Sequence, residues 1–238
     1  LMLQRYSSSK AVLGLLLQAH KKRKEKISLG TYPYTYARVS AMRALLLKKE
    51  DYHKLLKMQL NEIISFLQES QYKKEVDELA VHYSGPRLME LALNKNLVNT
   101  WNKLKRIATK NLQFVINAYL LRMDVWNIKT ILRAKYTNLP QKELELMLLP
   151  AGLLDQKKLQ ELYKKVSIEE LLKELGMVEF GRVRAAYEKF METNSLAELE
   201  NYFDVLYYSA MDNLANMLPE QGRLFREFLE LEQAFSSI

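Results

Sequence analysis

Residues 58–67, MQLNEIISFL, and residues 166–175, VSIEELLKEL, carry the same pattern of apolar and acidic positions. Six positions agree at a constant offset of 108 residues, and among them Glu62 falls on Glu170. Apolar residues three and four apart share one face of a helix, so both stretches predict amphipathic helices. A helical pattern that returns along the chain predicts an internal duplication, and a duplicated chain favours a scaffold over a single catalytic pocket.

The far ends of the two units agree as well. Tyr119-Leu120 falls on Phe228-Leu229 at an offset of 109, so one net residue of insertion separates the two registers. Each unit of roughly 105 residues is large enough to bury a small core of its own. The sequence therefore predicts three parts: residues 1–30 as a tail, extension or expression remnant, residues 31–138 as a first helical unit, and residues 139–238 as a second.

The composition predicts an all-α protein. The chain has 238 residues, of which 48% are hydrophobic and 27% charged, with seven Gly and five Pro. Its abundant Leu, Lys and Glu favour helix almost everywhere, because these residues lose little rotamer freedom in a helix. The absence of cysteine excludes disulfides, a thiolate nucleophile and a Cys-based zinc site, and it fits a reducing compartment such as the cytoplasm.

Helical periodicity places the expected elements. From Leu97 to Trp126 apolar residues recur at three- and four-residue steps, with no Gly or Pro until Pro140. This run predicts one rod of roughly 40 residues, which would be roughly 60 Å long. The third helix of the first unit is expected to end at Gly85-Pro86. The other predicted helices are centred on residues 36–46, 60–67, 72–83, 159–175, 183–191, 196–217 and 225–231.

Charge is divided unevenly along the chain. Residues 1–135 carry 25 Lys and Arg against 10 Asp and Glu, a net charge of +15, whereas residues 136–238 carry 11 against 18, a net charge of −7. Such a field can orient a protein between two differently charged partners. The alternative is that two solvated helical faces differ in composition without consequence for binding.

The sequence contains no motif that predicts catalysis. It has no Gly-rich phosphate loop and no Gly-x-Ser-x-Gly nucleophile motif, and its three His lie far apart. We therefore expect a protein that is not an enzyme, with no cofactor, no metal site and no small-molecule substrate. The longest charge-free stretches, residues 11–19 and 111–121, are shorter than the roughly 20 apolar residues of a membrane span, so none is expected.

Nucleic-acid binding has some support from the basic run Lys21–Lys26, which could neutralise phosphates. The aromatic residues Trp101, Tyr119 and Trp126 lie at the spacing of a helix core, however, where burial is the expected explanation. No nucleic-acid partner is therefore expected.

Three motifs resemble one known family: residues 34–42, YTYARVSAM, residues 124–135, DVWNIKTILRAK, and residues 148–152, LLPAG. Together they are similar to the C subunit of the A/V-type rotary ATPases, whose counterpart in eukaryotic vacuolar ATPases is the d subunit. The resemblance implies a non-catalytic, all-helical funnel of three similar units around a pseudo-threefold axis. Two such units fit into this sequence, so the third is expected to be missing from it or replaced by residues 232–238.

The same resemblance implies a place and a task. Such proteins sit in the central stalk, peripherally on the cytoplasmic face of the membrane. There they form a socket that couples the rotor shaft to the membrane rotor ring for ATP-linked proton or sodium transport. The expected partners are the proteins of the central shaft and the membrane rotor ring.

Charged and polar residues that accompany the motifs are the candidates for partner contacts, with capping or solvation of their own helices as the competing interpretation. An alternative function is a helical-repeat adaptor that binds protein or RNA, which a steep salt dependence of RNA binding would reveal. The candidate interface residues are Arg38, Arg43, Asn127, Lys129, Arg133 and Lys135.

Overall fold

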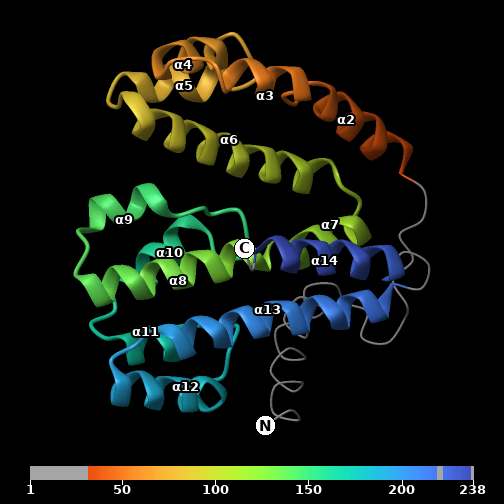
Figure 1. The fold of residues 1–238 in the computed structure, drawn as a ribbon. Coiled ribbons are helices and arrows are strands. Elements are labelled where there is room, and N and C mark those ends of the chain that lie inside the picture. Colours follow the sequence, from red (N-terminus) through yellow and green to blue (C-terminus); the bar gives the residue numbers. More distant parts are fainter. Residues whose placement is uncertain (1–31, 219–221, 237–238) are drawn as a thin grey trace. The chain divides into compact units, whose positions relative to one another are not determined.

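The computed structural model describes residues 32–218 and 222–236, and within these ranges every regular element is an α-helix (Figure 1). The predicted all-α fold class is therefore confirmed. The predicted tail of residues 1–30 lies outside the described residues. The helices are α2 Pro33–Ala44, α3 Lys49–Leu55, α4 Leu60–Gln68, α5 Lys73–Ala80, α6 Gly85–Ile107, α7 Lys110–Tyr119, α8 Leu121–Thr137, α9 Gln141–Met147, α10 Gln156–Tyr163, α11 Ile168–Glu174, α12 Phe180–Thr193, α13 Ala197–Met217 and α14 Gly222–Ser236.

The described helices form two compact units. One contains α2 to α6 and ends at Thr109, and the other begins at Lys110 and contains α7 to α14. We call them the α2–α6 unit and the α7–α14 unit. The boundary expected from the repeat, between residues 138 and 139, falls between α8 and α9 and thus inside the α7–α14 unit.

The predicted rod of roughly 40 residues is wrong. Helix α6 ends at Ile107, and Ala108 has an extended backbone with φ −80° and ψ 146°. Helix α7 then starts directly after Thr109, a residue type that often precedes a helix start. The break has a tertiary cause, because α6 packs on α4 and α5 whereas α7 packs on α8 and α13. Between α7 and α8 the interruption is a single residue, Leu120.

The α2–α6 unit has a small core at the junction of α4, α5 and α6. Leu67, Val76, Leu88 and Ala92 are buried there. The Gly85-Pro86 pair does not end the preceding helix as predicted, because α5 already ends at Ala80; instead the pair starts α6. Gly85 has φ +60°, which favours glycine, and a proline in the first turn lacks only an N–H that the helix would not use.

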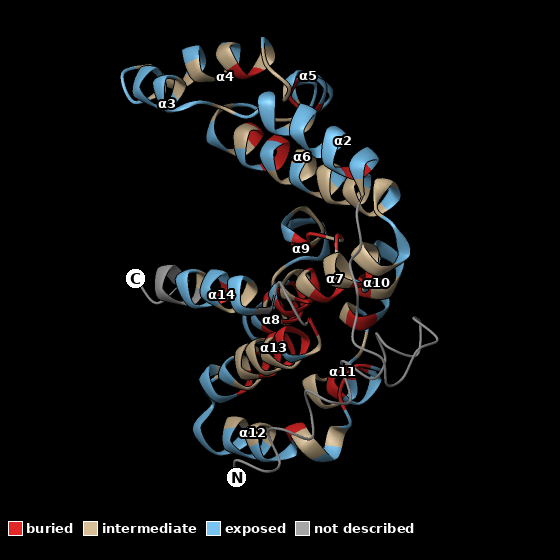
Figure 2. Ribbon diagram, turned by 90° about the vertical axis from the view of Figure 1, so that its right-hand side faces the viewer, coloured by how far each residue is buried: buried red, intermediate tan, exposed pale blue. Residues whose placement is uncertain are grey.

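The α7–α14 unit is built around α8 and α13, which lie side by side (Figure 1) and carry half of its buried residues (Figure 2). Helix α8 is buried on most of its circumference, so helices α7, α9, α10 and α13 all pack on it. Phe203 of α13 is among the largest fully buried side chains of this core. The buried side chains of α8 are therefore fixed within a dense set of neighbours.

The helix starts follow the offset seen in the sequence. Helices α10, α11, α12 and α13 start 107, 108, 107 and 112 residues after α3, α4, α5 and α6.

The coincidence of Glu62 and Glu170 also has a physical reason. Glu62 accepts a hydrogen bond from the backbone N–H of Gln59 at the start of α4, and Glu170 accepts one from Val166 at the start of α11. Both carboxylates satisfy N–H groups that the helix leaves free. The arrangement of such repeats about a threefold axis stays a prediction.

Candidate functional site

Two of the three motifs meet in space. Asp124 and Asn127 lie three residues apart on one face of α8, and both are fully buried. The two carboxylate oxygens of Asp124 accept hydrogen bonds from the backbone N–H groups of Leu153 and Leu154, at 2.8 and 2.9 Å. The two motifs are thus two sides of one contact.

The amide of Asn127 completes this contact. Its Oδ1 accepts a hydrogen bond from the backbone N–H of Leu149 at 2.7 Å, and its Nδ2 donates one to the carbonyl oxygen of the same residue at 2.8 Å. A single side chain therefore satisfies both backbone groups of Leu149 away from water. We call the contact of Asp124 and Asn127 with residues 149–154 the α8 clamp.

Gly152 belongs to the α8 clamp because the site has no room for a larger residue. A Cβ on this residue would lie deep inside the van der Waals radius of the Asp124 carboxylate. The glycine of the Leu-Leu-Pro-Ala-Gly motif is thus explained by the close approach of the chain to a buried carboxylate. In this structure the two motifs form an internal contact that holds residues 149–154 against α8.

Asn127 is therefore misplaced among the interface candidates. It is fully buried, and both polar atoms of its amide are used by Leu149. A side chain with no exposed surface contributes nothing directly to a partner contact.

Lys129 and Arg133 join α8 to α13. Lys129 Nζ lies 2.9 and 2.7 Å from the two carboxylate oxygens of Asp204, and the Arg133 guanidinium makes two parallel hydrogen bonds of 2.6 Å to Glu200. The two cations lie one turn apart on α8, and the two acids lie one turn apart on α13. Because the later cation contacts the earlier acid, the two helices run antiparallel. The paired Arg–carboxylate geometry is the strongest form of such a contact. Both cations are thus held by acids of their own unit.

Lys135 joins α8 to the chain that follows α10. Its amine donates a hydrogen bond to the backbone carbonyl oxygen of Lys165 and lies 5.2 Å from the centre of the Tyr163 ring. Burial lowers the pKa of Lys135 below its ordinary value. Four of the six candidates therefore use their polar groups inside the α7–α14 unit.

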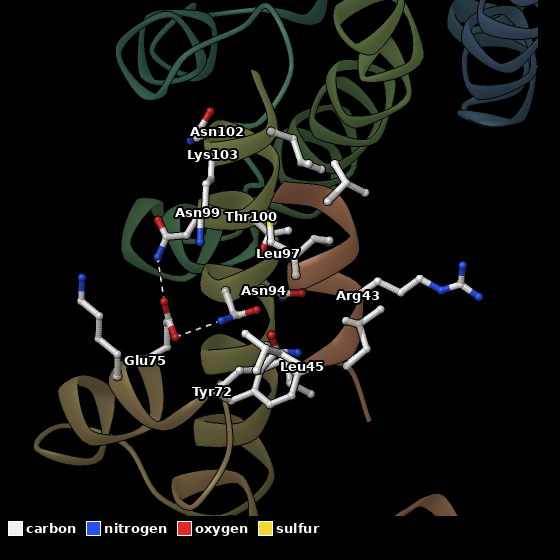
Figure 3. Close-up of a pocket in the computed structure, with 18 of the residues that line it drawn as sticks. Arg43, Leu45, Tyr72, Glu75, Asn94, Leu97, Asn99, Thr100, Asn102 and Lys103 are labelled. Carbon is white, nitrogen blue, oxygen red and sulfur yellow. Dashed lines mark hydrogen bonds between the residues drawn. The ribbon is translucent and has the colours of Figure 1, made fainter. Parts of the chain in front are cut away.

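Arg38 and Arg43 are different. Both lie on α2 with exposed side chains, and neither makes a salt bridge to any residue in the parts of the chain that the structure describes. Arg43 extends outward from α2 (Figure 3). These two of the six candidates are the ones whose charge is available to a partner.

The sequence-based interpretation also missed an exposed residue. Trp126 was expected to be buried, but its side chain is 54% exposed on α8. The adjacent residues explain this, because Val125 and Asn127 occupy the buried faces of the helix and leave Trp126 on the outside. The acids Glu200 and Asp204 were missed as well, although their spacing of four residues matches that of Lys129 and Arg133.

The ion pair of Arg133 and Glu200 gives a testable pH dependence. The Arg133 hydrogen bonds lower the pKa of Glu200, so the ionised pair stabilises the fold above the ordinary carboxyl range, and this stability is lost as the pH falls through the lowered pKa. Arg133→Gln is expected to cost about 1 kcal/mol near neutral pH, since the arginine is largely exposed. Urea unfolding curves should show this cost shrinking below about pH 4.

The matched control for this prediction is Arg184→Gln. Arg184 pairs with Glu188 four residues away on α12, and both side chains are more than half exposed. Arg184→Gln is expected to lower the free energy of unfolding by roughly 0.3 kcal/mol. An equal cost for both variants, or a cost of Arg133→Gln that does not change with pH, would contradict a special role for the bidentate pair.

The part of the chain that the structure describes contains neither a metal-binding cluster nor a membrane-spanning helix. Among them, no three His, Asp or Glu side chains are grouped so that they could hold a metal ion. Within the same residues no helix is both long and apolar enough to cross a membrane.

Comparison with known proteins agrees with the motifs. The family model described as ATP synthase (C/AC39) subunit matches residues 35–238. The C subunit of the A-type ATP synthase of Methanosarcina acetivorans is 39% identical over 215 residues, which is 90% of this chain and 59% of that protein. The proteins of the same name from Methanosarcina mazei and Haloferax volcanii are 40% and 38% identical over 90% and 87% of the chain. The chain thus spans about three fifths of the length of these curated relatives. Because the match covers both compact units, the chain belongs to the ATP synthase (C/AC39) subunit family.

Proposed function

We propose that this chain is a non-catalytic component of the central stalk of an A/V-type rotary ATPase, where it couples the rotor shaft to the membrane rotor ring. The observation that carries the proposal is the family match from residue 35 to residue 238. The C subunits of A-type ATP synthases support it, with identities of 38 to 40%. The proposed location is peripheral, on the cytoplasmic face of the membrane, and the proposed transport is of protons or sodium ions.

The packing of the α7–α14 unit suits a part that carries torque. Helices α8 and α13 are held together by a buried apolar seam and by two ion pairs, Lys129–Asp204 and Arg133–Glu200. The α8 clamp fixes the loop of residues 149–154, which follows α9, to helix α8 through four hydrogen bonds. A close-packed interior deforms little, so a force applied at one side of this unit is passed on rather than absorbed.

Partner contacts are proposed at Arg38 and Arg43. The α2–α6 unit, residues 31–109, has 13 Lys and Arg against eight Asp and Glu, whereas residues 110–238 have 16 against 19. The positive unit therefore contains the candidates with available charge. Electrostatic complementarity would set which partner this unit meets and in which orientation.

The test is recovery of partners from detergent-solubilised membranes of the source organism. The tagged chain is expected to bring down the proteins of the central shaft and the rotor ring, identified by mass spectrometry. Arg38→Glu/Arg43→Glu is expected to lower that recovery about fivefold or more, because charge reversal opposes complementary docking. The matched control is Lys49→Glu/Lys57→Glu, which makes the same change of charge at exposed residues of the same unit.

Two results would contradict the proposal. Recovery of no ATPase component by a folded chain would remove the coupling role. Recovery of RNA-associated proteins, lost steeply as salt rises, would favour the helical-repeat adaptor instead. Equal recovery by both double variants would leave the stalk role in place and remove Arg38 and Arg43 from the interface.

A further inference from the structure

The α2–α6 unit contains an open groove between α2 and α6, with α5 at one end. Its volume is about 1120 Å³, and all its lining residues belong to this unit (Figure 3). We call it the α2–α6 groove. It is large enough for several side chains of a partner, and it takes no part in the α8 clamp.

Both walls of the groove carry exposed leucine side chains, among polar side chains of α6 such as Asn94, Thr100 and Asn102. Thr35 is the only buried residue of α2, and Leu45 and Leu46 just beyond the helix are 62% and 53% exposed. On the facing side, Leu93 and Leu97 of α6 are 40% and 38% exposed. Large apolar side chains that gather on one concave surface mark an interaction site more often than singly scattered ones do.

A hydrogen bond fixes one end of the groove. The Thr35 hydroxyl donates to the carbonyl oxygen of Ile107 at 2.7 Å, so the first turn of α2 is tied to the last turn of α6. Towards the other end of α2, Leu45 and Leu46 line the groove together with Tyr72 and Leu93. The two helices therefore run antiparallel and form two continuous walls.

The rim of the groove is positive. Arg43, Lys74, Lys103 and Arg106 line it, and none of the four makes a salt bridge within the described part of the chain. The acid that lines it, Glu75, is 5% exposed and accepts hydrogen bonds from the side-chain amides of Asn96 and Asn99, at 3.1 and 2.9 Å (Figure 3). Its charge is therefore turned inward, and the rim presents cations alone.

We propose that the α2–α6 groove binds an amphipathic helix of a partner protein, with an apolar stripe flanked by Asp and Glu. Two antiparallel helices with leucine walls form the kind of groove that receives apolar residues at helical spacing from a third helix. The cationic rim selects acidic flanks and opposes basic ones. A nucleic acid fits less well, because Tyr72 is the one aromatic side chain of the groove and its other apolar side chains, mostly leucine, offer no stacking platform for bases. Such binding goes beyond the proposed coupling role and does not depend on it.

The test uses the full chain and two designed, end-capped peptides of about 18 residues, long enough to form a helix. Both carry leucine at helical spacing, and the flanking positions are Glu in one peptide and Lys in the other. Fluorescence anisotropy is expected to show the acidic peptide binding about tenfold or more tightly than the basic one, with affinity falling as salt rises. Equal affinities, or tighter binding of the basic peptide, would overturn the proposal.

Matched variants locate the binding. Leu46→Glu, in the wall, is expected to weaken acidic-peptide binding about tenfold, whereas Leu56→Glu, which is 84% exposed and outside the groove, should leave it unchanged within about twofold. Lys74→Glu/Lys103→Glu is likewise expected to weaken binding, and Lys57→Glu/Lys73→Glu serves as its charge-matched control. If both members of either pair act alike, the peptide binds elsewhere and the proposal is overturned. A single-stranded RNA that competes with the peptide at the Leu46 wall would also overturn the assignment to a helix.

Discussion

Gly152→Ala is expected to lower the free energy of unfolding of the α7–α14 unit by about 3 kcal/mol. The added methyl group would overlap the Asp124 carboxylate, which is fully buried and holds the N–H groups of Leu153 and Leu154. Either the loop moves away and leaves those N–H groups without acceptors, or α8 shifts in a core that is already filled. Both responses are costly, because unsatisfied buried polar groups and displaced core side chains each cost on the order of 1 to 3 kcal/mol.

Denaturant unfolding followed by fluorescence can measure this effect within one unit. The chain has two tryptophans, Trp101 in the α2–α6 unit and Trp126 in the α7–α14 unit, so a Trp101→Phe background reports on the unit that contains Gly152. The control is Gly181→Ala on α12, where a Cβ meets nothing within 4 Å. It is expected to raise stability by roughly 0.5 to 1 kcal/mol, as alanine favours helix over glycine. An unchanged midpoint for Gly152→Ala would show that Asp124 does not press on this loop.

The sequence predicts a helix well where apolar residues recur at helical spacing. The stretch 60–67 becomes α4 because apolar spacing acts locally, whereas Gly85-Pro86, predicted to end a helix, lies at the start of α6 after α5 has ended at Ala80. The break at Ala108 was not predictable in this way. Ile107, Ala108 and Thr109 contain no strong helix breaker, and the helix is interrupted there because α6 and α7 pack against different helices. Local propensity is a weak guide wherever tertiary contacts compete with it.

The sequence identified the important residues of the motif but not their role. The spacing of Asp124 and Asn127 places them on one helix face, yet it does not tell whether that face meets a partner or a loop of the same chain. Their acceptors and donors lie 22 to 30 residues away, in a segment with no helical period of its own. A buried polar residue and a surface polar residue look alike in a single sequence. Only the packing of residues 149–154 distinguishes them.

The packing of α8 on α13 explains part of the uneven distribution of charge along the sequence. Basic residues of α8, Lys129 and Arg133, meet acids of α13, Asp204 and Glu200, so some of the contrast between the two halves of the sequence is neutralised inside the α7–α14 unit. The cations of the α2–α6 groove form no such ion pairs among the described residues. The α2–α6 unit therefore keeps a set of cations that are open to a partner.

Asn127→Asp is expected to have the largest effect of the changes considered, a loss of about 3 to 5 kcal/mol near neutral pH. The two side chains have the same shape, so no cavity is made. The substitution replaces the N–H₂ that donates to the Leu149 carbonyl by a second oxygen, which brings two acceptors together and places a negative charge at a fully buried position. The Leu149 carbonyl also loses its donor.

The pH dependence of this variant separates the hydrogen-bond argument from a general loss of packing. Burial and the facing carbonyl oxygen raise the pKa of the introduced carboxyl above its value in the unfolded chain. The folded state then binds more protons than the unfolded state, so part of the lost stability returns as the pH falls and is lost again as it rises. A protonated carboxyl has an O–H that can donate to Leu149, as the amide does now.

Unfolding curves of Asn127→Asp and Asn127→Ala against pH make the comparison. The alanine variant is expected to stay destabilised throughout, because it has no group that can regain the bond. If the two variants lose the same stability at every pH, the contact between Asn127 and Leu149 acts by filling space, and the α8 clamp is not held by its hydrogen bonds.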